Sequence, residues 1–165
     1  MKRSQLEQTH TLAVVVENKA GVLARVAGLF ARRAFNIESL AVAPIDDRFS
    51  RITIVVDAAS APIDQINKQL DKLIDVVSIN ELDPEASALR EMLLVRMELD
   101  DESQVAEVEE LIDGFSGSVI RTRGSQMMLS LSSRPDDLDS LLEKLQPFGI
   151  AELQRTGAIA IPGIE

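Results

Sequence analysis

The residues best suited to binding chemistry form a short segment, residues 18–23, with the sequence Asn-Lys-Ala-Gly-Val-Leu. An apolar run precedes this segment and an amphipathic pattern follows it, so we expect it to join a strand to a helix. The first amides of a helix lack intrahelical acceptors and carry partial positive charge, so they attract carboxylates and phosphates. Gly21 would let such a ligand approach the backbone, and Asn18 could add a side-chain hydrogen bond.

The same segment also has a purely structural explanation. Asn18 could cap the helix while Gly21 makes the turn, and spacing alone does not decide between the two interpretations. Neither G-x-G-x-x-G nor G-x-x-x-x-G-K occurs here, so the anion is not expected to be a nucleotide.

Two further features of the first half could serve a ligand or a partner. Asn36 lies at the start of an expected strand, and its amide could face an ammonium or carboxylate group, although the residue alone favours an ordinary turn or strand-start role. A stripe of small residues could let a partner helix pack closely, or could simply be a helix-forming surface. Its members are Ala24, Ala27, Gly28 and Ala31.

The rest of the chain offers no catalytic constellation. It has no Cys, Trp or Tyr and a single histidine, His10, which excludes thiol chemistry, disulfides and multi-histidine metal sites. One expected helix carries acidic residues that are typical of a solvated face rather than a metal site. They are Glu102, Glu107, Glu109, Glu110 and Asp113.

The composition of the chain excludes further classes of protein. The 165 residues carry a formal charge of −10, which argues against a nucleic-acid binder, and 45% are hydrophobic, enough for a packed core. The first eight residues are polar, and no run of about 18 apolar residues occurs. We therefore expect a soluble, cytoplasmic protein without membrane contact.

Hydrophobic periodicity predicts the same order of elements, βαββαβ, in both halves. In the first half the elements are expected at residues 11–16, 22–33, 35–44, 51–57, 62–73 and 76–82. In the second half they are expected at residues 93–99, 105–115, 118–122, 126–132 and 135–145, with a final strand ending at Ile161.

A connector at residues 83–87 separates the halves, and most of the excess negative charge follows it. We therefore expect two domains, 1–83 and 84–165, of the α+β class, each a ferredoxin-like unit with both helices on one face of an antiparallel sheet. The other face of each sheet must be covered or polar, which favours dimerisation.

The first half closely resembles a known family. The motifs that carry the resemblance are N-x-x-G-x-L-x-R-V at 18–26, G-L-F at 28–30, N-I-E-S-L at 36–40 and S-R-I-T-I at 50–54. Together they resemble the N-terminal ACT domain of the small regulatory subunit of acetohydroxyacid synthase, also called acetolactate synthase. In the second half the resemblance rests on size, element order and R-E-M-L-L-V at 90–95.

The resemblance implies a subunit without an active site of its own. Such subunits bind a catalytic large subunit, raise its activity and confer feedback inhibition by valine in branched-chain amino acid biosynthesis. The cofactors, thiamine diphosphate, Mg and FAD, would belong to that partner. Leucine or isoleucine could replace valine as the effector, because one methylene changes affinity by only about 1 to 3 kcal/mol.

The resemblance also implies a location for the effector site. Two ACT domains would pair in a homodimer, with Asn18 and Gly21 from one chain and Asn36 from the other. The carboxylate would meet amides near Gly21 and Val22, and an aliphatic pocket would be lined by Val22, Leu23 or Ile37.

Two alternatives remain at this point. A free-standing tandem ACT sensor acting on another enzyme or a transcription factor would share the same loop. A small enzyme on a ferredoxin-like scaffold is also conceivable, because fold does not fix function.

Overall fold

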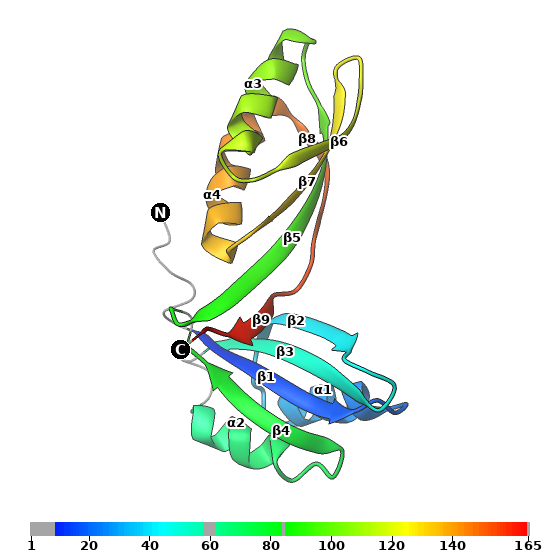
Figure 1. Cartoon of the computed structure of the whole chain (residues 1–165), viewed down its shortest axis with the longest axis vertical. Coiled ribbons are helices and arrows are strands. Elements are labelled where there is room, and N and C mark those ends of the chain that lie inside the picture. Colours follow the sequence, from blue (N-terminus) through cyan, green and yellow to red (C-terminus); the bar gives the residue numbers. More distant parts are fainter. Residues whose placement is uncertain (1–8, 58–61, 84, 165) are drawn as a thin grey trace. The chain divides into compact units, whose positions relative to one another are not determined.

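The computed structural model describes residues 9–57, 62–83 and 85–164 (Figure 1). The chain divides into two compact units. One contains the described residues up to Leu89 together with those from Gly157 onward, and the other is Arg90–Thr156.

The first unit contains the expected βαββαβ elements. They are β1 (Thr9–Glu17), α1 (Val22–Arg32), β2 (Ile37–Pro44), β3 (Phe49–Asp57), α2 (Ile63–Leu70) and β4 (Val76–Leu82). The strands form an antiparallel sheet in the order β2-β3-β1-β4, and both helices lie on one side of it (Figure 1). The core is built from alternate residues of β1 and β3, such as Val14 and Ile54, packed against Val26 and Phe30 of α1.

The second unit repeats this arrangement. Its elements are β5 (Ser87–Glu98), α3 (Ser103–Asp113), β6 (Ser118–Arg123), β7 (Gln126–Ser133), α4 (Pro135–Leu145), a 3₁₀ turn (Gln146–Phe148) and β8 (Ile150–Arg155). The sheet order is β6-β7-β5-β8, and the first three residues of β5 belong to the first unit. The two ferredoxin-like units expected from the sequence are therefore confirmed.

The end of the chain differs from the expected single last strand. It forms two strands, β8 and β9 (Ile159–Pro162), and β9 pairs with β5 and lies in the first unit (Figure 1). Its small residues Ala158 and Ala160 are buried in a second apolar cluster with Ala13, Val55, Leu82 and Leu89. Ala13 and Val55 point away from the helices because strand residues alternate between faces. The chain thus covers part of that sheet face itself.

Candidate functional site

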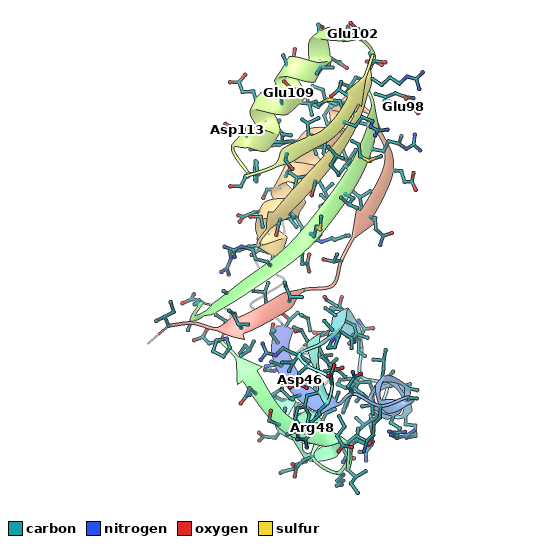
Figure 2. All side chains as sticks on the ribbon, turned by 45° about the vertical axis from the view of Figure 1, so that its right-hand side comes forward. Asp46, Arg48, Glu98, Glu102, Glu109 and Asp113 are labelled. Carbon is teal, nitrogen blue, oxygen red and sulfur yellow. The ribbon has the colours of Figure 1, made fainter. Side chains whose placement is uncertain are left out.

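Two backbone hydrogen bonds hold the β1–α1 loop, residues 18–21, at one end of the first sheet. The Asn18 amide donates to the Arg48 carbonyl oxygen (2.8 Å), and the Glu17 amide donates to the Asp75 carbonyl oxygen (2.9 Å). The turn that contains Arg48 is itself closed by Asp46, whose Oδ1 accepts hydrogen bonds from the amides of Arg48 (2.7 Å) and Phe49 (2.8 Å). Figure 2 labels Asp46 and Arg48 at this turn. The loop therefore has a fixed position between the β2–β3 turn and the start of β4.

Gly21 sets the direction of the chain into α1. It is the N-cap residue and has a left-handed conformation (φ 84°, ψ −6°), which glycine adopts without steric cost. No side chain caps this helix, so Asn18 is not its cap. The only acceptor recorded for the Val22 amide, within the described residues, is the Lys19 carbonyl oxygen at 3.4 Å, a long contact. The first turn of α1 is thus open to an external anion.

An arginine that the sequence did not single out lies beside this turn. The Nε and Nη2 atoms of Arg25 lie 2.8 and 2.7 Å from the same oxygen of Asp75, whose side chain is buried. The third nitrogen, Nη1, would be 3.1 Å from a Cβ atom placed on Gly21. Arg25 is therefore held next to the loop by its ion pair with Asp75, and its Nη1 lies on the side of Gly21. Fifty positions separate it from Asp75, so only the fold reveals the pair.

The other expected effector residues have different surroundings. Asn36 is exposed just before β2, and its Nδ2 donates to the carboxylate of Glu38. Ile37 is half-buried against the core, whereas Leu23 is 43% exposed. Val22 is 4% exposed and packs inside its own unit, so it can offer a ligand its amide rather than its side chain. Within the part of the chain that the structure describes, no recorded hydrogen bond links Asn36 to residues 18–23.

The remaining sequence features do not gather around this loop. Ala24 and Ala31 are exposed on α1, while Ala27 and Gly28 are half-buried. Acidic residues in α3 and just before it are exposed on the second unit, and Figure 2 labels Glu102, Glu109 and Asp113 among them. His10 lies 2.7 Å from Glu81.

The described residues contain no group of three or more His, Cys, Asp or Glu side chains arranged to hold a metal. None of their helices has the length and apolar composition needed to cross a membrane.

The second unit contains a partly buried ionic cluster that the sequence did not reveal. Arg155 of β8 donates to the carboxylates of Glu91 and Asp139, and its Nη2 donates to the Pro135 carbonyl oxygen at 3.2 Å. Burial raises the pKa of Glu91, outweighing the opposing effects of the Arg155 hydrogen bond and charge. Burial acts to lower the pKa of Arg155, but its two carboxylate partners raise it overall. Both pKa values are raised, that of Glu91 because burial penalises its charged form and that of Arg155 because it faces two carboxylates. The cluster joins β5, β8 and the start of α4, which is a structural role.

Because of this raised pKa, we expect Glu91→Gln to leave stability at pH 7 within about 1 kcal/mol of the parent chain. The folded chain holds the Glu91 proton more tightly than the unfolded chain does. The contribution of protonated Glu91 to stability is therefore complete below the ordinary pKa of 4.5. It is lost as pH rises through the raised pKa of the folded chain. The free energy of unfolding of the parent minus that of the variant should fall across this window, as urea titrations at several pH values would show. Glu143→Gln, at an exposed carboxylate of α4, is the control, and a difference that grows with pH would contradict the assignment.

The comparisons with known proteins agree across both units. Residues 12–78 match the family model of the AHAS small subunit-like ACT domain, and residues 90–163 match that of the small subunit of acetolactate synthase. The acetolactate synthase small subunit of Mycobacterium bovis is 46% identical over 156 residues, covering 93% of this chain and 92% of the relative. The probable small subunit of Archaeoglobus fulgidus is 40% identical over 153 residues, 92% of this chain and 95% of the relative.

A solved structure supports the same assignment. The acetolactate synthase small subunit of Thermotoga maritima superposes with a TM-score of 0.86 at 32% identity, covering 95% of this chain and 98% of that one. The chain therefore belongs to the family of acetolactate synthase small subunits.

Proposed function

We propose that this regulatory subunit activates a catalytic acetolactate synthase large subunit and makes it sensitive to inhibition by valine. Family membership supports the partner, and the open first turn of α1 supports the effector. The catalytic subunit would supply thiamine diphosphate, Mg and FAD. The effector domain would be residues 1–83 and the C-terminal domain 84–165, and the complex would act in the cytoplasm.

The open helix turn is the observation that carries the effector part of the proposal. No side chain caps the amides at the start of α1, and the Arg25 guanidinium lies beside Gly21. An amino acid carboxylate matches this environment, because helix N-termini and guanidinium groups both stabilise anions. Asn18, which is exposed, would orient the ligand from the same loop.

A second copy of the chain would complete the site. Strand β2 is at an edge of its sheet, so its outer backbone groups are available to pair with another strand. Pairing of two ACT domains would bring Asn36 of one chain toward the loop of the other. Leu23 and Ile37 would then contact the aliphatic side chain of the ligand. Valine offers few atoms, so we expect a dissociation constant between micromolar and millimolar, roughly 8 to 4 kcal/mol.

The proposal is tested by reconstituting the large subunit with and without this chain and measuring acetolactate formation while valine is titrated. We expect no product from the chain alone, higher activity from the complex, and a decrease in that activity with valine. Leucine and isoleucine in parallel titrations would establish the preferred effector. If the chain has no effect on its large subunit, the proposed function is wrong.

Arg25→Gln should weaken valine binding by up to about fivefold, because an exposed charge near a carboxylate contributes up to about 1 kcal/mol. It should also lower stability, because the buried Asp75 carboxylate loses its arginine partner, so affinity is compared at a temperature where both variants are folded. Isothermal titration is suitable because the chain has no Trp or Tyr to report binding optically. Arg32→Gln, in the last turn of α1, removes the same charge far from the first turn and should leave affinity unchanged. Equal losses in both variants would show that Arg25 acts only through net charge.

A further inference from the structure

Glu38 is an exposed glutamate near the start of β2, the strand at one edge of the first sheet. The register between β2 and β3 shifts between Ile37 and Ser39, which pair with consecutive residues of β3. Glu38 is therefore the extra residue of a β-bulge and has no partner on β3. Bulges at the edge of a sheet commonly redirect a side chain. Glu38 thus lies at the same edge that the pairing of two ACT domains would use.

The contact between Glu38 and Asn36 decides which end of the Asn36 amide is available to a ligand. The Nδ2 atom of Asn36 donates to the carboxylate of Glu38. A carboxylate only accepts hydrogen bonds, so the nitrogen of the amide, and not its oxygen, must face it. The oxygen, Oδ1, is bonded to the same carbon and is turned away from Glu38. Asn36 therefore offers a ligand an acceptor rather than a donor.

The two parts of the proposed effector site differ in charge. Glu38 has no recorded cation partner among the residues that the structure describes, so its negative charge is not neutralised within the chain. On the loop side, the first turn of α1 contains no acidic residue. The Arg48 guanidinium, in the turn that holds the loop, lies 5.2 Å from the centre of the Phe49 ring. A ligand with one negative and one positive end matches this arrangement.

We propose that Glu38 makes the effector site specific for ligands that carry a free ammonium group beside their carboxylate. Its carboxylate attracts the ammonium charge and also holds the Asn36 amide with Oδ1 toward the ligand, ready to accept a hydrogen bond from that ammonium. The carboxylate of the ligand would lie at the first turn of α1 of the other chain. This inference rests on the proposed function, which includes both the effector and the pairing of two ACT domains.

A purely structural role for Glu38 makes a different prediction. If Glu38 only steadied Asn36 at the start of β2, removing its charge would weaken every ligand of the site to the same extent. In the proposed role, the charge favours a ligand with an ammonium group and repels a ligand that has only a carboxylate. The ratio of the two affinities therefore distinguishes the roles.

Titrations of the isotope-labelled full chain with valine and with isovalerate, which is valine without its ammonium group, test the inference. Nuclear magnetic resonance shifts of the Gly21 and Val22 amides report binding even when the dissociation constant is millimolar. Glu38→Gln should weaken valine binding by about fivefold, the effect of one exposed charge pair, and leave isovalerate binding unchanged or stronger. Glu109→Gln removes the same charge from an exposed position of α3 and should not change the ratio.

The exchanged pair, Asn36→Asp with Glu38→Gln, is the second variant. The introduced amide can donate to the introduced carboxylate, so the acceptor oxygen and the negative charge are both retained, and valine affinity should return to within about twofold of the parent value.

The inference is wrong, and the proposed function stands, if the parent chain binds valine but Glu38→Gln leaves the ratio of affinities unchanged. A double variant that stays as weak as Glu38→Gln would also overturn the inference. If the parent chain binds no valine, either alone or with its large subunit, the effector part of the proposed function is wrong and the inference fails with it.

Discussion

The double variant Asn18→Ala, Asn36→Ala is expected to lose saturable valine binding, with affinity falling roughly 100-fold or more. Each amide would hydrogen-bond a charged group of the ligand, and such bonds contribute about 1.5 to 3 kcal/mol each. Both side chains are exposed, so their removal should not disturb the core. Isothermal titration of the purified chain measures the change directly.

Activation of the large subunit distinguishes a variant that no longer binds the effector from one that no longer folds. The double variant should still raise acetolactate formation, but valine should no longer reduce it. Asn80→Ala, at an exposed asparagine of β4, is the matched control and should behave as the parent chain does. Unchanged valine affinity in the double variant would show that the effector binds elsewhere.

Gly157→Ala is expected to lower the free energy of unfolding by about 3 kcal/mol or more. A Cβ atom at this position would lie 2.2 Å from the carbonyl oxygen of Leu40 and 2.5 Å from its carbonyl carbon. Both obstructing atoms belong to the backbone of β2, so no side-chain rotation relieves the overlap. The next amide, from Ala158, donates to Ser39 Oγ (2.7 Å), and this bond would be lost with the displaced segment.

Urea unfolding followed by far-ultraviolet circular dichroism should show this loss in the transition of the first unit, since two units need not unfold together. Hydrogen exchange should become faster at β9. Gly114→Ala is the matched control, because the nearest atom to its new Cβ would be 3.7 Å away, an ordinary contact. Equal stability of the two variants would mean that the Gly157 segment can move aside at little cost.

The sequence predicted most of the fold because its patterns were local. The alternation of buried and exposed residues in β5 and the one-sided apolar stripe of α1 each arise within a single element. The βαββαβ order and the position of the Gly21 turn followed from these patterns. Element ends were less accurate, and α2 ends at Leu70 rather than near Leu73 because the chain turns at residues 71 and 72.

The features that the sequence did not predict depend on contacts between distant residues. Asp75 pairs with Arg25 across 50 positions, and neither residue type is unusual in its own segment. Strand β9 is four residues long and its one buried residue is Ala160, which carries little hydrophobic signal, so the pattern does not separate β9 from the strand before it. The sequence also could not decide whether Asn18 caps α1. Asparagine is a common capping residue, but its side chain does not cap this helix.

The return of the chain to the first unit at Gly157 makes the second unit an insertion within the first. A fragment ending near Asp83 would lack Leu89, Ala158 and Ala160, and its sheet would expose Ala13, Val55 and Leu82 to solvent. The amino-terminal unit is therefore complete only when Ala158 and Ala160 have been synthesised. During translation, the first unit would wait for the whole inserted unit to leave the ribosome before its second apolar cluster could close.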